Sequence, residues 1–568
     1  MVRFEERKVP VTGEKYVTVF GSGTALRDDP ILNKGTCFPE AERDALGLRG
    51  LLPPDVATPE EQEERAYGHY RRATDDIQRY LTLAALQDRN ETLFYRLLSH
   101  HLEEMVPIVY TPTVGKVCEQ YSHIYRRPRG VYVSSRDRGR IAEVLSNQRR
   151  EGCRVIVITD NEAILGIGDQ GVGGMGIAIG KLALYTAGAG IHPARALPLD
   201  FDVGTDNAAL LDDPLYLGVR EPRLKGEAYF SLLDELVEAI LSIYPGALVQ
   251  WEDFAKHNAF RVLERYRRRL LSFNDDIQGT GAVVVAGMRR ALARVGRHWG
   301  DERIVLYGAG AAGAGCALAL RATLREQGVP ESELNRRVLC LDSRGLVLAD
   351  RPGLEGEKRD IAADPALVTD WLGAPSPPGL LDVIEHFRPT ALLGVSGQPG
   401  AFTEQVVRWM QVGCERPIIL PLSNPTSLCE ATPENLLRWT HGAAVVGTGS
   451  PFPDVVHGDI HYQIGQGNNA LIFPGIGLGA TAVEACWLPD SAFAAAAGAV
   501  AEFPIAAGPG APIYPPLSKL REVARQVARA VGRSLVSSGD APHILDAEVD
   551  ARIRSATWEP VYLPYRPA

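Results

Sequence analysis

The chain has 568 residues, of which 45% are hydrophobic and 23% charged, as in soluble globular proteins of two or three domains. Its formal net charge of −10 argues against a nucleic-acid partner, because phosphate recognition needs a basic surface. No apolar run approaches the roughly 18 residues of a membrane span, and the opening stretch lacks the apolar core of a signal peptide. The eight cysteines contain no C-x-x-C pair, which favours reduced thiols and a cytoplasmic location.

The predicted elements change in kind along the chain. Residues 1 to about 55 are mixed and rich in turns, whereas apolar residues recur at helical spacing from Glu60 to about Leu102. Short β-branched runs then alternate with helices between residues 154 and 425, a pattern typical of parallel α/β architecture. "QIGQGNNALIFPGIGLG" at 463–479 interrupts this series, and a mainly helical tail follows.

A glycine-rich turn at Gly308-x-Gly310-x-x-Gly313 has the context of a dinucleotide site. The strand "RIVLY" leads into it and a helix of small residues leaves it. Such glycines let the backbone approach a pyrophosphate at the helix N-terminus. Asp342 ends the next predicted strand, where an acid bonds the adenine-ribose hydroxyls and favours NAD. Basic residues within 344–358 keep NADP open, and a plain strand-to-helix turn is the alternative.

A second stretch, Gly166-x-Gly168-x-x-Gly171, has the same glycine spacing but fits a dinucleotide less well. Asp169 would face the pyrophosphate with a like charge, and further glycines delay the helix to about residue 177. Lys181 follows among apolar residues, and its burial would lower its pKa. We expect either a functional amine or a surface lysine whose stem packs on apolar neighbours.

Two pairs of carboxylates follow predicted strands. Glu252 and Asp253 end "ALVQWED", and Asp275 and Asp276 end "LLSFNDD". Ligands of an open α/β sheet bind outside the carboxyl ends of its strands. Converging carboxylates repel one another unless a cation lies between them, and oxygen ligands favour Mg²⁺ or Mn²⁺ over zinc. The alternative is a set of solvated loop acids.

Several long motifs resemble those of malic enzymes and of the closely related malolactic enzymes. They run in order over nearly the whole chain: "YTPTVGK", "GIGDQGVGGMGIAIGK", "WEDFAKHNAFRVL", "FNDDIQGTG", "GVSGQPGAFT", "LSNPTS" and "GQGNNALIFPG". The resemblance implies oxidative decarboxylation of L-malate to pyruvate and CO₂ with NAD and either Mn²⁺ or Mg²⁺. It also makes the Gly308 loop the NAD site and the Gly166 loop a flexible, close-approach segment beside malate that delivers Lys181.

The resemblance implies roles for individual residues as well. Lys181, neutral when it acts, would take the C2 hydroxyl proton, and Tyr110 would protonate C3. Arg65 and Arg89 match arginines that bind a dicarboxylate effector in some relatives, with surface ion pairing as the alternative. The remaining implied residues are the metal ligands Glu252, Asp253 and Asp276, Asp275 behind them, Asn424 beside substrate and cofactor, and Asn469 beside the substrate.

One departure from the family pattern leaves the reaction outcome open. Malic enzymes carry an arginine where this chain has Ala163, and malolactic enzymes carry glycine there. We predict oxidative decarboxylation with released NADH. The alternatives are a malolactic enzyme that makes L-lactate and CO₂ with bound NAD, and a non-catalytic dinucleotide sensor. The intact Tyr110, Lys181 and metal-ligating acids argue against the sensor.

The predicted fold is α/β, with a helical N-terminal region, a parallel α/β substrate domain, a Rossmann-type NAD-binding domain and a helical C-terminal tail. The predicted boundaries are 1–128 for the N-terminal helical domain, 129–275 for the substrate- and metal-binding domain (completed by about 465–535), 276–464 for the NAD-binding domain and 536–568 for the tail. A homodimer or homotetramer is implied by the resemblance, with no nucleic-acid or membrane partner.

Overall fold

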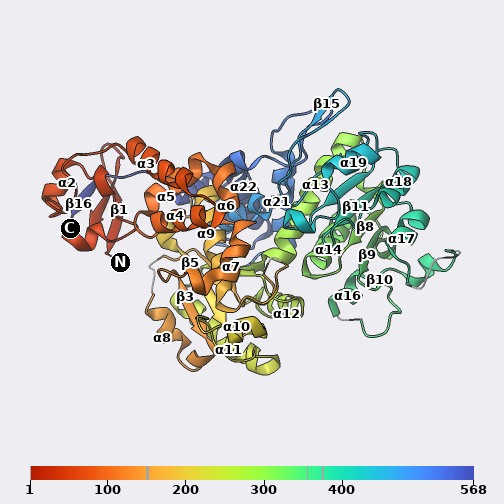
Figure 1. Ribbon diagram of the computed structural model, residues 1–568, viewed down its shortest axis with the longest axis horizontal. Helices are drawn as coiled ribbons and strands as arrows, with labels where there is room; N and C mark the ends of the chain where they lie inside the picture. Colours follow the sequence, from red (N-terminus) through yellow and green to blue (C-terminus); the bar gives the residue numbers. More distant parts are fainter. Residues whose placement is uncertain (1, 149–151, 165, 355, 372, 374–376) are drawn as a thin grey trace.

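The computed structural model describes residues 2–148, 152–164, 166–354, 356–371, 373 and 377–568. Two large sheets dominate it: a five-stranded sheet in the order β3-β5-β4-β6-β7 and a six-stranded sheet in the order β10-β9-β8-β11-β12-β13. The first sheet lies near the centre of Figure 1 and the second at its right, with helices packed around both. The predicted α/β fold with a Rossmann-type domain is confirmed.

The five-stranded sheet is wholly parallel, so all its carboxyl ends lie at one edge. Its strands are buried, as expected where helices cover a parallel sheet. The strands are β3 (Val131–Ser134), β4 (Val155–Thr159), β5 (Ala196–Asp202), β6 (Leu248–Glu252) and β7 (Ser272–Asn274), and the helices of this part are α8 (Ile141–Ser146), α9 (Met175–Ala189), α10 (Ala208–Asp212), α11 (Gly226–Ile243) and α12 (Lys256–Tyr266).

In the six-stranded sheet, the chain order reverses between β8 and β11, which are neighbours. A crevice at such a reversal is the usual ligand position in an open α/β sheet. The strands are β8 (Ile304–Tyr307), β9 (Val338–Asp342), β11 (Ala391–Gly394), β12 (Ile418–Pro421), β13 (Val445–Val446) and the antiparallel edge β10 (Gly345–Leu346). The helices are α14 (Ala311–Glu326), α15 (Glu331–Arg337), α16 (Gly356–Ile361), α17 (Leu380–Phe387), α18 (Glu404–Gly413) and α19 (Pro433–Trp439).

Helices from both ends of the chain pack together beside the first sheet. Helix α9 contacts α5 from the N-terminal part and both α20 and α22 from the C-terminal part, and α13 contacts α14 and α21. Thr58 caps α3 through a reciprocal capping box with Glu61. The helices are α1 (Gly23–Arg27), α2 (Glu40–Ala45), α3 (Pro59–Arg72), α4 (Asp76–Gln87), α5 (Glu91–His100), α6 (Leu102–Val109), α7 (Thr113–Ile124), α13 (Thr280–Val295), α20 (Phe473–Ala482), α21 (Asp490–Glu502), α22 (Leu520–Ser538) and α23 (Asp546–Ala556).

Two small sheets were not predicted. Strands β1 (Phe4–Lys8), β2 (Lys15–Val19) and β16 (Tyr565–Pro567) form one, so the two ends of the chain lie side by side at the left of Figure 1. A hairpin of β14 (Val455–His457) and β15 (Ile460–Tyr462) projects at the top of Figure 1. The tail is therefore helical only as far as Ala556.

One expectation about apolar runs was wrong. The helical stretch Gly171–Ala189 is long and apolar enough, by length and composition alone, to cross a membrane. It is nevertheless 94% buried inside the protein. Its apolar side chains are explained by packing, because α9 lies between the first sheet and helices α7, α20 and α22.

Candidate active site

Helix α9 carries Lys181 into the protein interior. Glycines before and within the helix allow this, because a Cβ at Gly173 would collide with the carbonyl of Cys118, and one at Gly180 would lie 2.7 Å from the carbonyl of Val109. These glycines therefore allow close packing of α9 against other parts of the protein backbone. The Lys181 side chain is 1% exposed, which excludes the surface alternative.

The loop before α9 is anchored at Asp169. This carboxylate accepts hydrogen bonds from the backbone N–H groups of Gly171 at 2.9 Å and Asp206 at 2.8 Å, and from Arg223 Nη1 at 3.3 Å. The expectation of a flexible loop is thus not supported by its contacts. Asp169, whose negative charge argued against a pyrophosphate at this loop, instead stabilises the turn.

Lys181 forms two buried ion pairs. Its Nζ lies 2.8 Å from Glu252 Oε1 and 2.5 Å from Asp275 Oδ2. Burial lowers the pKa of Lys181, but the Asp275 and Glu252 carboxylates outweigh burial and raise the pKa well above that of a free lysine. The sequence-based expectation of a lowered pKa is wrong for this state, because it considered burial without these partners.

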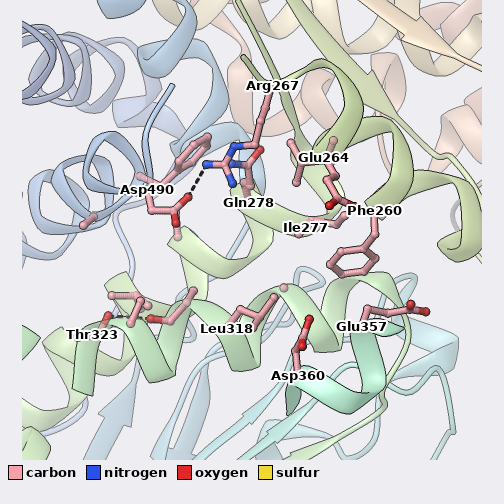
Figure 2. Close-up of a pocket in the computed structure, with 18 of the residues that line it drawn as sticks. Phe260, Glu264, Arg267, Ile277, Gln278, Leu318, Thr323, Glu357, Asp360 and Asp490 are labelled. Atoms are coloured by element: carbon pink, nitrogen blue, oxygen red, sulfur yellow. Dashed lines mark hydrogen bonds and ion pairs between the residues drawn. The ribbon is translucent and has the colours of Figure 1, made fainter. Parts of the chain in front are cut away.

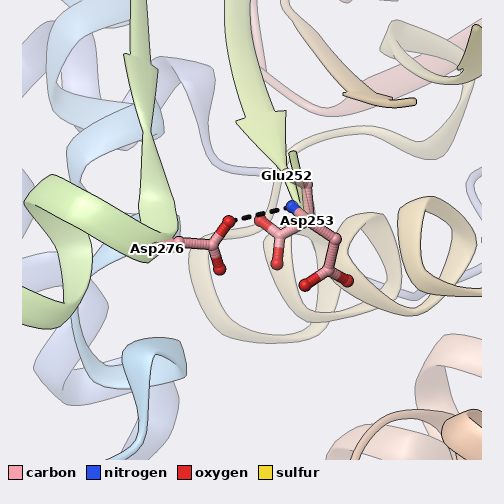
Figure 3. A group of neighbouring side chains, drawn as sticks. All are labelled: Glu252, Asp253 and Asp276. Atoms are coloured by element: carbon pink, nitrogen blue, oxygen red, sulfur yellow. Dashed lines mark hydrogen bonds between the residues drawn. The ribbon is translucent and has the colours of Figure 1, made fainter. Parts of the chain in front are cut away.

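Three of the four predicted carboxylates converge where β6 and β7 end. Figure 3 shows Glu252 and Asp253 at the end of one strand, facing Asp276 from the segment after the next. One oxygen of each lies within 4.8 Å of the others, and the Asp253 N–H donates to Asp276 Oδ2 at 2.9 Å. Asp253 has a positive φ of 55°, a backbone conformation uncommon outside glycine that is enriched at functional sites.

This cluster has the properties of a divalent-cation site. Burial raises the pKa of Glu252 and that of Asp276, and neighbouring carboxylates raise both further, although the Lys181 ammonium opposes the rise. Three carboxylates with little water and mutual repulsion fit a hard cation that prefers oxygen ligands. Asp275 is outside the cluster and bonds Lys181 and Asn469 instead, as expected of a residue behind the ligands.

Tyr110 lies beside the lysine, directly after α6. Lys181 Nζ is 5.3 Å from the centroid of its ring. Burial raises the pKa of Tyr110, although Lys181 opposes the rise, so the phenol keeps its proton and can donate it. The structure thus places Tyr110 in the same buried site as the amine.

The two predicted amides lie at different depths. Asn469 Nδ2 donates to Asp275 Oδ2 and Thr280 Oγ1, both at 3.0 Å, and so belongs to the lysine network. Asn424 is exposed after β12, and Ser450 Oγ donates to its Oδ1 at 2.6 Å. The structure therefore brings Asn469 to the carboxylates and leaves Asn424 at the strand ends of the second sheet.

The predicted dinucleotide loop lies between β8 and α14. A Cβ at Gly313 would collide with the carbonyl of Gly308, and Gly308 has a φ of +117°, so both positions require glycine. A Cβ at Gly310 would meet nothing within 4 Å, which leaves space above the helix N-terminus. This geometry suits a pyrophosphate.

Asp342 ends β9 and is already paired. Its carboxylate lies 2.8 Å from Arg351 Nη1 and 2.6 Å from Lys358 Nζ. Burial raises the pKa of Asp342, but the hydrogen bonds from Lys358 and Arg351 outweigh burial and lower the pKa to about 2. These three side chains meet at the end of β9, the neighbour of the strand β8 that leads into the Gly308 loop, so they bear on the choice between NAD and NADP.

The arginines predicted as an effector site are both exposed and form no ion pair among the described residues. Ion pairing, the alternative considered for them, is thus absent there. Arg89 lines a small cavity of about 290 Å³ with His69 and Arg126, and Arg65 does not. The effector role stays a prediction.

A separate groove of about 790 Å³ lies behind the carboxylates, between α12, α14, α16 and α21. Figure 2 shows Ile277 and Gln278, which directly follow Asp276, on its wall, and the Arg267–Asp490 ion pair across it. No residue predicted for the chemistry lines this groove, so it is not the catalytic cavity.

Three positions near the lysine were not selected from sequence. The ring of Phe473 lies 4.6 Å from Lys181 Nζ. Gln250 donates to Glu252 Oε2 at 2.7 Å, and Thr280 accepts from Asn469. Phe473 lies within the quoted motif "GQGNNALIFPG", and this motif is the sequence feature that could have identified it. Gln250 could have been found from its alternation with Glu252 on one strand.

Comparison with known proteins gives the family. Residues 87–267 match the family model "Malic enzyme, N-terminal domain", and residues 277–536 match "Malic enzyme, NAD binding domain". The chain belongs to the malic enzyme family. The resemblance seen in the sequence motifs is thereby confirmed, and the Gly308 loop lies within the segment that matches the NAD-binding model.

Curated malic enzyme relatives cover almost the whole chain. The NAD-dependent malic enzyme of Sodalis glossinidius (strain morsitans) is 47% identical over 546 residues, 96% of this chain and 97% of the relative. That of Acinetobacter baylyi is 44% identical over 96% of both chains. Among solved structures, the Entamoeba histolytica malic enzyme has a TM-score of 0.55 at 21% identity, covering 90% of this chain and 92% of that one. This last likeness concerns the fold.

Proposed function

We propose that this malic enzyme catalyses the oxidative decarboxylation of L-malate to pyruvate and CO₂ with reduction of NAD, and that it requires Mn²⁺ or Mg²⁺. The observation that carries the proposal is the buried Lys181, which lies between the cluster acid Glu252 and Asp275 and beside Tyr110. A candidate proton acceptor, a candidate proton donor and a candidate cation site thus lie together in one buried cluster. Relatives named as NAD-dependent malic enzymes support the same reaction.

Binding of the two cofactors is assigned to separate residues. Glu252, Asp253 and Asp276 would hold the divalent ion, and the Gly308–Gly313 loop would receive the NAD pyrophosphate. The ion would supply polarisation of the C2 oxygen of malate, and NAD would supply the acceptor for the C2 hydride. Asn424 and Asn469 would hold malate and the nicotinamide between these two sites.

Lys181 is assigned the proton of the C2 hydroxyl. The same Glu252 carboxylate serves both the lysine and the proposed ion site, so the ammonium and the ion compete for it. Asp275 keeps its hydrogen bond to Lys181 Nζ and is itself held by Asn469, which orients the amine. We infer that Lys181 acts as a base once the ion shares the charge of Glu252.

Tyr110 is assigned the final proton transfer. After CO₂ leaves C4, the enol of pyruvate must gain a proton at C3, and the buried phenol is the donor. Lys181, whose charge acts on the Tyr110 phenol, is the group assigned to return a proton to the phenol oxygen. General acid–base catalysis of this kind typically contributes about 10²–10⁴-fold to the rate.

The experiment is NADH formation by the purified protein with malate, NAD and Mn²⁺, each omitted in turn. Asp276→Asn should abolish NADH formation and weaken Mn²⁺ binding, because it removes one of three charged ligands. Asp490→Asn, at an exposed acid behind the site, is the matched control and should keep both. Wild-type Mn²⁺ affinity in Asp276→Asn would remove the cluster from the proposal.

We further propose a cytoplasmic homodimer or homotetramer. The cytoplasmic location is supported by the cysteines, none of which forms a disulfide among the described residues. The oligomeric state is supported by the family resemblance alone. A single sedimentation experiment at working concentration distinguishes a monomer from either assembly.

A further inference from the structure

A further cavity, of about 610 Å³, lies away from the catalytic residues, at the base of the β14–β15 hairpin. Its walls are the C-terminal half of α13, Arg416 two residues before β12, strand β13, the β15 segment and the glycine-rich loop 505–511. This size is within the usual range for small-molecule sites, about 300–1,000 Å³. None of the residues assigned to malate, NAD or the metal lines it.

Three arginines line this cavity and no acidic residue does. Arg290 and Arg294 are one turn apart on α13, and Arg416 approaches from the start of β12. Within the described part of the chain, none of the three forms an ion pair with a carboxylate. The nearby Arg297, by contrast, pairs with Glu302 at 3.0 Å. The cavity therefore holds three positive charges without a counter-charge.

The hydrogen bonds of these arginines neutralise little of that charge. Arg290 Nη2 donates to the Phe503 carbonyl at 2.5 Å, and Arg294 Nη2 donates to the Pro512 carbonyl at 2.7 Å. Arg290 Nε is buried without a hydrogen-bond partner among the described atoms. Burial lowers the pKa of Arg294, and the charges of Arg290 and Arg416 lower it further. Such mutual repulsion disfavours leaving the cavity without an anion.

We propose that this three-arginine cavity binds an oxyanion of at least two negative charges, bearing phosphate or carboxylate groups. Planar guanidinium groups donate paired hydrogen bonds to both kinds of group. The apolar part of the wall, which includes Leu437, Val445 and Ile460, lowers the local dielectric and strengthens the attraction. Phosphate and carboxylate compounds share this recognition chemistry, and the binding experiment separates them.

Three segments that line the three-arginine cavity are continuous in sequence with residues assigned to the active site. Helix α13 begins at Thr280, four residues after Asp276, and β12 leads to Asn424. Gln463, on the cavity wall, precedes the segment that ends at Asn469. A bound oxyanion therefore lies where it can shift the malate-binding amides, and this consequence rests on the proposed function.

The test is isothermal titration of the full-length protein with pyrophosphate and, separately, with citrate, in saturating NAD so that the dinucleotide loop is filled. We expect saturable binding of at least one probe and a roughly tenfold or larger loss of affinity in Arg294→Gln and in Arg416→Gln. Arg289→Gln, on the same helix but outside the cavity, is the control and should bind as wild type. Tighter binding of pyrophosphate identifies a phosphate ligand, and tighter binding of citrate a carboxylate ligand.

No saturable binding of either probe, or equal affinity in wild type and both cavity variants, would overturn the site. Arg416 is exposed, so its variant should fold, and its melting temperature checks this. The coupling has its own readout: the bound probe should change the KM for malate in wild type and not in Arg416→Gln. Binding of a probe without a change in the KM for malate would overturn only the proposed coupling to the active site. Absence of turnover with intact probe binding would instead contradict the proposed function and leave the three-arginine cavity unaffected.

Discussion

Replacing Lys181 by alanine should separate two roles of this residue, stability and catalysis. The side chains of Lys181, Glu252 and Asp275 are exposed by only 1%, 2% and 0%. Lys181→Ala leaves both carboxylates buried without their cation, and breaking a buried pair in this way costs about 3–5 kcal/mol. We expect a loss of unfolding free energy of that size in metal-free protein.

Added Mn²⁺ should restore much of this stability, because it supplies a new cation beside Glu252. It should not restore turnover: without the base, kcat should stay at least about 10²-fold below wild type. The assay is denaturant unfolding with and without Mn²⁺, combined with steady-state kinetics on the same preparations. A chelated sample of each variant gives the metal-free value.

The matched control is a second buried pair, remote from the site. Lys34 Nζ lies 2.6 Å from Glu42 Oε2, with 2% and 10% of the side chains exposed. Lys34→Ala should lose comparable stability, gain nothing specific from Mn²⁺ and keep its kcat. Equal recovery of both variants with Mn²⁺, or a near-normal kcat in Lys181→Ala, would refute the reasoning.

Three further results are expected. Asp342→Asn frees Arg351 and Lys358 for a ribose phosphate, so kcat/KM with NADP relative to NAD should rise about tenfold or more, and an unchanged ratio would contradict this. Burial raises the pKa of Asp160 from 3.8 to about 6, so the folded protein holds this proton more tightly than the unfolded chain does. Protonated Asp160 therefore stabilises the fold at low pH by up to about 3 kcal/mol, and this contribution is lost as pH rises through about 6. Urea unfolding of wild type and Asp160→Asn at about pH 5 and about pH 7 measures it, and a constant difference would count against it. Ala163→Arg should lower the KM for malate by pairing with a carboxylate; an unchanged KM would show that another group holds it.

The sequence located the acids because their positions follow from a simple rule. Parallel strands present their carboxyl ends at one edge, so Glu252 and Asp276 had to approach each other once both strands were recognised. The dinucleotide loop was recognisable for a similar reason, since its strand, glycines and helix are contiguous. Local patterns therefore predicted most of the fold and much of the candidate site.

Long-range partners were not predictable in this way. The pKa of Lys181 depends on Asp275, 94 residues away, and considering burial without that carboxylate gave the wrong direction. Strand β16 pairs with β2 across nearly the whole chain, and neither strand has a strong pattern of its own. The anchoring of the Gly166 loop could not be predicted, because two of the groups that bind the Asp169 carboxylate come from the distant residues 206 and 223.

The most direct test of the proposed reaction is the product balance. The purified protein is incubated with L-malate, NAD and Mn²⁺, and pyruvate, lactate and free NADH are measured in the same samples. Oxidative decarboxylation predicts equal amounts of pyruvate and NADH with no lactate. Lactate formed in proportion to malate consumed, without free NADH, would contradict it and identify the malolactic reaction instead.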